Sequence, residues 1–473
     1  MLERKVVRLT AGSAVLGLVL AAGVVTLAGP WDSGQRTAER ARAAAQAPAS
    51  GADHGAPGPA RPAPRPPAPA PSAAGVLAAL TAPGTRAARE PAAPPPRALS
   101  ATLGPLFGDP GLGPLRTASV IDATTGKQLY GSGAATPMTP ASTIKIATAA
   151  AALSALGPDH RIPTTVVATA DARRVFLVGG GDPTLDPARL AALAADTARA
   201  LRARGVTSVQ LAYDTSRYTG PERHPIGVND NIAPVTALMT GEGRLDGSTS
   251  GPAPRSADPA GDTARTFAGL LAKQGVTPGK PPARARAPKK ATPLATTRSL
   301  PLSALVERAL TYSDNDIAEA LARQTAIAAG RPASFAGAAR AVEERLRELG
   351  VPLNGARFAD GSGLDRRDRV SAALLTSLLA EAADPSRPQL RPVLTGLPVG
   401  GFSGTLADRY PDGSPGAGLV RAKTGTLTGV NTLAGTVVTA DGRLLAFAFL
   451  AGRTASADGA QSALDRLAAA LTG

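Results

Sequence analysis

Two regions of the chain carry hydrophobic residues at a period of two, which is the spacing of a half-buried strand. Residues 117–133 alternate on both sides of a turn at 124–127, and this pattern predicts a β-hairpin. Residues 419–426 and 431–452 predict three antiparallel strands, the last two of which are joined at Asp441-Gly442. Both regions are typical of an antiparallel sheet.

Helical periodicity appears in five other stretches, which are residues 140–157, 302–330, 333–350, 370–384 and 462–473. The second of these predicts two helices that meet at Ser313-Asp314-Asn315, and glycines at 157 and 350 end the first and third. DGSGL at 360–364 predicts a turn. Because strands and helices are segregated along the chain, we expect an α+β fold with an antiparallel sheet flanked by helices.

The region between residues 158 and 299 is mixed. It contains candidate strands at Thr164–Ala170 and Val206–Ala212 and a candidate helix at Ala188–Arg204 that ends at Gly205. GGGDPTL, at 179–185, is interpreted as a tight turn, because no GK[ST] follows the glycines as it would in a phosphate-binding loop. Residues 277–298 are basic and rich in proline, and we expect them to form a solvated surface loop rather than a site that binds a wall polymer.

The first hundred residues do not show a globular pattern. Basic residues precede an uncharged run of 21 residues, Leu9–Gly29, which has the length of a membrane-spanning helix with its N-terminus inside. The alternative is a cleaved signal peptide. Residues 32–97 are dominated by proline and alanine, which predicts an extended or disordered linker. Both interpretations of residues 1–31 place the remainder outside the cytoplasm, either tethered to the membrane or secreted.

Composition excludes several kinds of chemistry. The chain has no cysteine, so disulfides, zinc–thiolate sites, iron–sulfur clusters and thiol catalysis are absent. Its three histidines make a histidine-rich metal site and a Ser-His-Asp triad improbable, and no other pattern indicates a cofactor. The formal net charge of +15 favours anionic surroundings, but no nucleic-acid recognition motif accompanies it. An anionic cell wall or membrane surface fits the exported chain better.

Ser142 and Lys145 carry the first candidate chemistry. A spacing of three residues at the start of a helix puts the hydroxyl and the amine on one face. Serine is a weak nucleophile until a neighbouring base takes its proton, and a desolvated lysine can do so because burial lowers its pKa. A lone S-x-x-K is weak evidence, since a solvated helix lysine would give the same pattern.

Two further motifs supply the other groups that such a serine needs. The hydroxyl of Ser313 can relay a proton and the amide of Asn315 can hold a carbonyl, although S-D-N alone equally fits a helix N-cap. In Lys423-Thr424-Gly425-Thr426, at a strand end, the lysine and the hydroxyls suit a substrate carboxylate, and the glycine lets a substrate strand approach. The backbone N–H groups of Ser142 and Thr426 form a candidate oxyanion hole.

The ordered combination S-x-x-K, S-D-N and K-T-G is typical of penicillin-interacting serine enzymes. From about residue 98 onward the chain resembles the D-alanyl-D-alanine carboxypeptidase/endopeptidases, which are low-molecular-mass class C penicillin-binding proteins of the actinobacterial type. The resemblance rests on PASTIKIATAAAALSALGPDHR, LVGGGDPTL, SDNDIAEALARQ, DGSGL, LPVGGFSGTL and VRAKTGTLTGVNTLAGTV. The long gap between the first and second motifs is similar to the family's inserted region.

The resemblance implies a transpeptidase-like catalytic domain built from residues 98–162 and 298–473, interrupted by smaller inserted α/β domains at 163–297. It implies that Ser142 is acylated by the penultimate D-Ala of a peptidoglycan stem peptide, that water hydrolyses the acyl-enzyme, and that β-lactams acylate the same serine. It also implies that Arg366 contacts the substrate side chain. The chain departs from the family at Asp365, where relatives commonly have serine, and over residues 217–230.

Three other functions remain open at this stage. A β-lactamase of class A would need an E-x-x-x-N loop between the second and third motifs, and none is evident between residues 316 and 422. A non-catalytic wall-binding protein would not require the intact nucleophile and base. A phosphate- or nucleic-acid-binding protein, suggested by the charge and by GGGD, would bind polyanions without Ser142. The balance between carboxypeptidase and endopeptidase action is not encoded in a recognisable motif.

Overall fold

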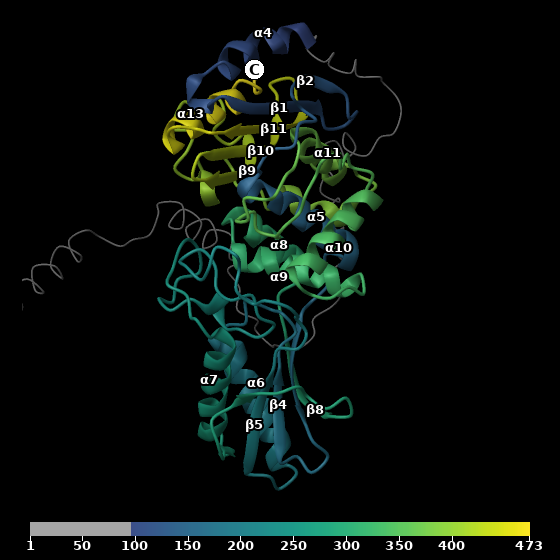
Figure 1. Cartoon of the computed structure of the whole chain (residues 1–473), viewed down its shortest axis with the longest axis vertical. Coiled ribbons are helices and arrows are strands. Elements are labelled where there is room, and N and C mark those ends of the chain that lie inside the picture. The colour runs from purple at the N-terminus through teal and green to yellow at the C-terminus, as the bar shows by residue number, and fades with distance from the viewer. Residues whose placement is uncertain (1–95) are drawn as a thin grey trace, which may run out of the picture. The chain divides into compact units, whose positions relative to one another are not determined.

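The computed structural model describes residues 96–473 (Figure 1). The predicted membrane segment and His54 lie outside the described residues, as does the predicted linker except for its last two positions. There the first described helix, α4, already begins at Pro96. None of the helices between residues 96 and 473 has the combination of length and hydrophobicity that crossing a bilayer requires.

A five-stranded antiparallel sheet has the strand order β2-β1-β11-β10-β9. Its strands are β1 (Leu115–Asp122), β2 (Gln128–Ser132), β9 (Val420–Leu427), β10 (Val430–Val438) and β11 (Leu444–Gly452). The predicted hairpin at 117–133 and the predicted strands at 419–452 are confirmed. The central strand β11 joins the N-terminal hairpin to the C-terminal strands, and β9 is left at an edge.

Helices cover both faces of this sheet (Figure 1). Phe447 and Phe449 of β11 pack in a cluster with α4 and α13, while Ala446 and Ala448 pack on the opposite face in a cluster with the other helices. Alternate residues of one strand point to opposite faces, so both sets become buried. The helices are α4 (Pro96–Phe107), α13 (Ala457–Ala469), α5 (Lys145–Leu156), α8 (Leu302–Thr311), α9 (Asn315–Ala328), α10 (Phe335–Glu348) and α11 (Ala372–Ala383).

A second, mixed sheet has the order β6-β5-β4-β3-β8, with β7 also paired to β5. The parallel pair β4 and β5 is joined by helix α6, and α6 and α7 share one apolar cluster with the sheet. The elements are β3 (Pro163–Ala168), β4 (Arg174–Val178), α6 (Pro187–Arg202), β5 (Ser208–Asp214), α7 (Pro259–Lys273), β6 (Thr277–Pro278), β7 (Ala283–Arg284) and β8 (Thr292–Arg298).

Part of the expectation for residues 277–298 is wrong. Their last seven residues form the edge strand β8, which pairs antiparallel with β3, and the short strands β6 and β7 lie within the same stretch. Pro293 sits where the register of β3 and β8 shifts, a position in an edge strand that tolerates a residue without an N–H group. Strand β4 was not predicted, because its apolar run of four residues is too short to be recognised.

The segment between β5 and α7, residues 215–258, leaves the second sheet and packs against α9; we call it the bridging segment. Its Tyr218, Ile232 and Val235 form an apolar cluster with Ala333, against which Ile327 of α9 packs. This cluster lies at the C-terminal end of α9, and Ala233 of the same segment donates its N–H to Asp316 at the N-terminal end. The remaining short helices are η1 (Pro110–Leu112), η2 (Ala141–Ile144), η3 (Gly241–Gly243), η4 (Pro388–Leu390), α12 (Pro392–Thr395) and η5 (Gly404–Leu406).

The edge strand β9 packs tightly against η2 at Gly425. A Cβ atom at this position would lie 2.7 Å from Pro140 O and would also collide with Thr432 Oγ1. Thr432 Oγ1 donates to Pro140 O at 2.7 Å and so ties β10 to the same turn. The glycine therefore serves the contact between the strand and η2, which the sequence had not indicated.

We expect Gly425→Ala to lower the free energy of unfolding by about 1–3 kcal/mol, because the added methyl group overpacks a backbone contact. Thermal melting followed by circular dichroism measures this change. Gly269→Ala is the matched control: its Cβ meets nothing within 4 Å in helix α7, so we expect a gain of about 0.4–1 kcal/mol. A Gly425→Ala protein as stable as the wild type would contradict the close packing.

Candidate active site

A cavity of about 290 Å³ opens where η2, the start of α9, strand β9 and the bridging segment meet. Five of the predicted site residues line it, which are Ser142, Ser313, Asn315, Thr424 and Thr426. The other lining residues are Asn231, Arg244, Gly251, Pro252, Arg255, Tyr312, Asp314, Leu364 and Thr405. Segments separated by 284 positions thus contribute side chains to one concave surface.

Lys145 and Ser142 are in direct contact at the base of this cavity. Ser142 belongs to η2 and Lys145 begins α5, so the two side chains emerge on the same face of one continuous turn. Lys145 Nζ lies 2.9 Å from Ser142 Oγ, 2.7 Å from Asn315 Oδ1 and 2.6 Å from Ser362 O. Two of these acceptors are carbonyl oxygens that bear no proton. A neutral amine that donates to both directs its lone pair at the serine hydroxyl.

Burial prepares Lys145 for that neutral state. Its side chain is almost completely enclosed, and burial lowers its pKa to about 8. The negative charges of Asp360, Asp314 and Glu319 act in the opposite direction and keep the pKa from falling further. About a tenth of the amines are therefore neutral at pH 7.

The S-D-N motif caps helix α9 and also contributes a side chain to the cavity. Asp314 caps helix α9 by accepting the backbone N–H of Ile317 at 2.9 Å, so the N-cap interpretation is confirmed. Asn315 nevertheless reaches the site, where its amide group donates to Asn231 O at 2.9 Å. Ser313 precedes the cap with a φ of +57°, a left-handed conformation that serine adopts only under constraint from its surroundings.

In the K-T-G-T segment, Thr424 and Thr426 line the cavity, whereas Lys423 is buried in the interior. Lys423 is fully buried, its Nζ donates to Thr424 O at 2.7 Å, and it is not one of the lining residues. Burial, together with the charge of Lys145, holds its pKa well below the usual value. Thr424 donates its hydroxyl to Thr405 at 2.8 Å, and Thr426 is exposed at the strand end.

Arg366 lies apart from the other predicted residues. It lines a neighbouring cavity of about 390 Å³ together with Met138, Arg369 and Arg453, and Ser142 does not contribute to this cavity. Its guanidinium donates to Thr428 O at 2.9 Å, just beyond strand β9. A ligand would have to extend past the end of β9 to reach both Ser142 and Arg366.

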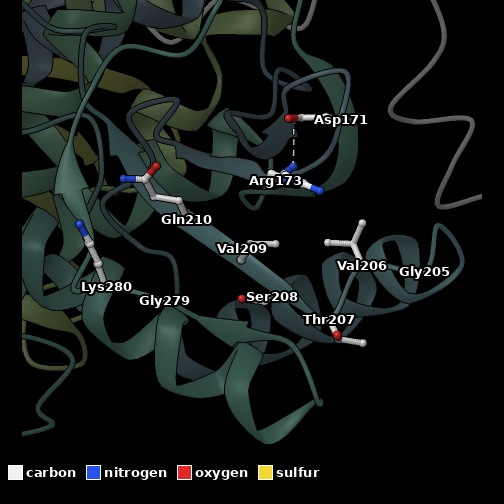
Figure 2. A pocket seen from close by; sticks show the side chains of 10 residues that line it. All are labelled: Asp171, Arg173, Gly205, Val206, Thr207, Ser208, Val209, Gln210, Gly279 and Lys280. Carbon is white, nitrogen blue, oxygen red and sulfur yellow. Dashed lines mark hydrogen bonds between the residues drawn. The ribbon is translucent and has the colours of Figure 1, made fainter.

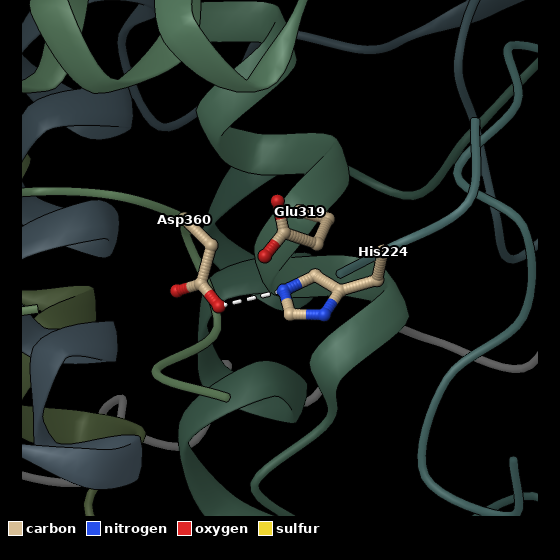
Figure 3. Close-up of side chains that lie close together, drawn as sticks. All are labelled: His224, Glu319 and Asp360. Carbon is tan, nitrogen blue, oxygen red and sulfur yellow. Dashed lines mark hydrogen bonds and ion pairs between the residues drawn. The ribbon is translucent and has the colours of Figure 1, made fainter. Parts of the chain in front are cut away.

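The turn at 360–364 contributes a group that sequence analysis missed. The carbonyl oxygen of Ser362 accepts the bond from Lys145, and Ser142 Oγ lies 3.5 Å from the same oxygen. Asp360, Glu319 and His224 converge behind this turn from three different segments (Figure 3). The motif DGSGL was recognisable in the sequence. Because every residue has a backbone carbonyl, the sequence does not indicate that the carbonyl of Ser362 binds Lys145.

The bridging segment also anchors the start of α9. Asp316 accepts the N–H of Ala233 at 2.9 Å and forms an ion pair with Arg255 at 3.1 Å. Arg244 is paired with Glu242 at 2.8 Å and lies 3.8 Å from Asp314. These buried pairs hold the residues on both sides of Asn315.

Two groups of buried side chains have the proximity of metal ligands. Most of their polar atoms already have a hydrogen-bond or ion-pair partner, whereas Glu319 Oε2 and Asp314 Oδ2 have no hydrogen-bond partner among residues 96–473. In the first, His224 Nε2 lies 2.9 Å from Asp360 and its Nδ1 accepts the N–H of Ile226 at 3.3 Å, so neither ring nitrogen is available. In the second, Glu242, Asp314 and Asp316 are interleaved with arginines.

A larger cavity of about 770 Å³ lies beside β5 of the second sheet (Figure 2). It is lined by residues of the turn between β3 and β4, the start of β5 and the loop after β6, and Asp171 accepts the backbone N–H of Arg173 at its rim. None of the predicted site residues contributes to it. We therefore assign the chemistry to the smaller cavity.

Comparison with known proteins agrees with this geometry. The model of the D-Ala-D-Ala carboxypeptidase 3 (S13) family matches residues 99–254 and 239–471. Carboxypeptidase DacB of Mycolicibacterium smegmatis is 38% identical over 396 residues, covering 80% of this chain and 84% of that protein. A carboxypeptidase of Mycobacterium tuberculosis is 38% identical over 373 residues, covering 74% and 79%.

Solved structures show the same fold. Penicillin binding protein 4 from Haemophilus influenzae has a TM-score of 0.66 at 22% identity, covering 78% of this chain and 97% of that chain. The same protein complexed with a β-lactam has a TM-score of 0.62 at 22% identity, covering 77% and 97%. Since the family model extends across the two sheets and the cavity, and the two carboxypeptidases share 38% identity over more than two thirds of the chain, the chain belongs to the D-Ala-D-Ala carboxypeptidase 3 (S13) family.

Proposed function

We propose that this protein is a serine-type D-Ala-D-Ala carboxypeptidase and endopeptidase that acts on peptidoglycan stem peptides through an acyl-enzyme at Ser142. The observation that carries the proposal is the contact between Lys145 Nζ and Ser142 Oγ at 2.9 Å, with two carbonyl oxygens fixing the other sides of the amine. Family membership supports the same reaction.

Acylation begins with proton transfer from Ser142 Oγ to the neutral amine of Lys145. The oxygen attacks the carbonyl carbon of the penultimate D-Ala, and the backbone N–H groups of Ser142 and Thr426 stabilise the developing oxyanion. Ser313 relays the proton to the departing amine, and the amide of Asn315 holds a substrate carbonyl. Release of the terminal D-Ala leaves an ester on Ser142, which water hydrolyses with Lys145 again as the base.

Substrate orientation comes from the third motif. The hydroxyls of Thr424 and Thr426 bind the terminal carboxylate, and Gly425 keeps β9 close enough to η2 for both threonines to face Ser142. Lys423 supports this region from behind through its bond to Thr424 O, close enough to Lys145 for the two charges to interact. β-Lactams, which resemble the D-Ala-D-Ala end, acylate the same serine and stay.

We also infer how the whole chain is organised. Residues 1–31 form a membrane anchor or signal, 32–97 a linker, 98–162 with 298–473 the catalytic domain, and 163–297 the inserted part. The second sheet, which begins at Pro163 and ends at Arg298, supports the last two boundaries. A family that cleaves peptidoglycan works outside the cytoplasm, and the basic start of the uncharged run supports tethering to the outer face of the membrane.

Intact-mass spectrometry with benzylpenicillin tests the nucleophile. We expect the wild-type protein to gain the mass of one benzylpenicillin and Ser142→Ala to gain none, while Ser119→Ala, a buried serine in β1, keeps the adduct. If no adduct forms and the drug stays intact, the result would point to a non-catalytic wall-binding protein. If no adduct forms and the drug is hydrolysed, the result would point to a β-lactamase.

The base is tested by the pH dependence of this acylation. Because only neutral Lys145 accepts the proton, we expect the rate constant to rise about tenfold per pH unit and to level off above a pH of about 8. Lys145→Arg should lower the acylation rate constant at least about 100-fold, since the guanidinium group does not deprotonate. Lys127→Arg, in the exposed hairpin turn, is the matched control. A flat pH profile would exclude Lys145 as the base.

The role of Arg366 is tested with a stem-peptide substrate. If its guanidinium binds the substrate side chain, we expect Arg366→Ala to lower kcat/KM for the peptide by about tenfold, with little change in benzylpenicillin acylation. Arg367→Ala is the control, because Arg367 is exposed and paired with Asp365. Equal kcat/KM values for the two variants would remove Arg366 from the substrate site.

A further inference from the structure

The carbonyl of Ser362 is a fixed part of the nucleophile's surroundings. It accepts from Lys145 Nζ at 2.6 Å, the shortest of the three bonds that this amine makes. The direction of the lysine lone pair toward Ser142 therefore depends on where this carbonyl stands. Any residue that holds the turn at 360–364 also holds the geometry of the base.

Asp360 organises that turn from within. Its carboxylate accepts the backbone N–H groups of Ser362 at 3.1 Å, Gly363 at 2.6 Å and Asp365 at 2.7 Å. Gly363 has a φ of +85° and packs so closely on Ala141 O that a Cβ atom has no room there. The turn is thereby pressed against the residue that precedes Ser142.

Glu319 supports the same turn from helix α9. Its Oε1 accepts the N–H groups of Gly361 and Ser362, each at 3.0 Å, while Oε2 is buried and has no hydrogen-bond partner among residues 96–473. Burial, with the charge of Asp360, raises the pKa of Glu319 to about 7. Two carboxylates thus share one small backbone turn.

His224 is the partner that the bridging segment brings to these carboxylates (Figure 3). Its ring is fully buried, lies edge-on to Phe335 at 5.4 Å between centroids, and places Nε2 at 2.9 Å from Asp360 Oδ2. The N–H of Ile226 points at Nδ1 at 3.3 Å, so the hydrogen on the neutral ring stands on Nε2 and is donated to Asp360. His224 therefore contacts this turn at Asp360, and Lys145 contacts it at the Ser362 carbonyl.

We propose that His224 is a positioning residue for the Ser142–Lys145 pair, acting through Asp360 and the Ser362 carbonyl. This inference rests on the proposed function, because it concerns the same nucleophile and base. It gives the inserted region a part in catalysis: the bridging segment completes the turn that orients the base. His224 itself touches neither the substrate nor the reacting atoms.

Electrostatics link the same residues. His224 is faced by Asp360 and Asp365 from the turn, by Glu319 from α9 and by the apolar Phe335 from α10. Burial alone would lower its pKa, but the bond to Asp360 and the charges of Glu319 and Asp360 raise it. Burial would raise the pKa of Asp360, but the bond and charge of His224, the N–H of Gly363 and the side chain of Asp368 together lower it to about 2.

Loss of the imidazole therefore has two effects of known sign. The pKa of Asp360 rises, and its weakened bonds loosen the turn, which slows acylation. Asp360 contributes the largest of the negative charges that favour the charged form of Lys145, so a displaced Asp360 favours that form less and the pKa of Lys145 falls. In a plot of the acylation rate constant against pH, the rising part (the acidic limb) then moves to lower pH, while the constant value reached at high pH (the plateau) decreases.

The experiment compares benzylpenicillin acylation across pH in the full chain. We expect His224→Ala to lower the plateau rate about 10- to 100-fold, as displacement of a catalytic group by about 1 Å does, and to shift the acidic limb downward. His224→Gln, whose side-chain amide restores a donor to Asp360, should recover most of the rate. His160→Gln, at the partly exposed histidine after α5, serves as the control. Melting temperatures show whether each variant is folded.

Two results would overturn the proposal: a folded His224→Ala protein with the wild-type rate and pH profile, or a His224→Gln protein as slow as His224→Ala. If the alanine variant does not fold, NMR of the wild-type histidines decides, with His224 identified by elimination in His54→Gln and His160→Gln proteins. Because His224 contacts the turn that holds the Ser362 carbonyl, we expect acylation of Ser142 to shift the imidazole resonances of His224, and unchanged resonances would contradict the proposal. A wild type that forms no adduct would instead refute the proposed function.

Discussion

The site depends on one buried amine that must be kept both desolvated and oriented. A lysine removed from water loses the solvation of its charged form, and this cost is tolerable only where acceptors or negative charges replace the lost water. Lys145 has two carbonyl acceptors from distant segments, Asn315 Oδ1 and Ser362 O, and contacts Ser142 Oγ in its own turn, while acidic groups lie further out. The surrounding elements place these groups near Lys145 and exclude solvent from it.

The two sheets contribute to the site in different ways. The five-stranded sheet brings β9 against η2, where Gly425 permits the backbone of the third motif to approach the nucleophile. The second sheet contributes nothing to the cavity directly, but the bridging segment that leaves it supplies Asn231 O to Asn315 and His224 to Asp360. The bridging segment thus contacts the proposed catalytic residues, although the second sheet from which it leaves packs around a core of its own.

Sequence patterns predicted the residues whose chemistry depends on their type. Ser142, Lys145 and Asn315 could be found because a hydroxyl, an amine and an amide at characteristic spacings leave a recognisable signature, and long periodic elements such as β10 and β11 were equally clear. Ser362 could not be found, because its contribution is a carbonyl that every residue carries. His224 was also missed, since its importance arises from contact with Asp360, 136 positions away. Strand β8 was mistaken for a loop, because the prolines and basic residues of the segment 277–298 obscure a strand that is held by β3 at one edge only.

The pairing of β1 with β11 has a consequence for biogenesis. Leu115 aligns with Gly452, so the central ladder of the catalytic sheet joins positions separated by most of the chain. Contacts between residues so far apart in sequence form late. Closing the long intervening loop costs conformational entropy before the contact contributes any favourable free energy. The nucleophile and the strand that completes its site therefore come together only after the C-terminal strands have been synthesised. A nascent or partly translocated chain holds Ser142 without β9, and the hydrolase is inactive until its last segment has emerged and folded.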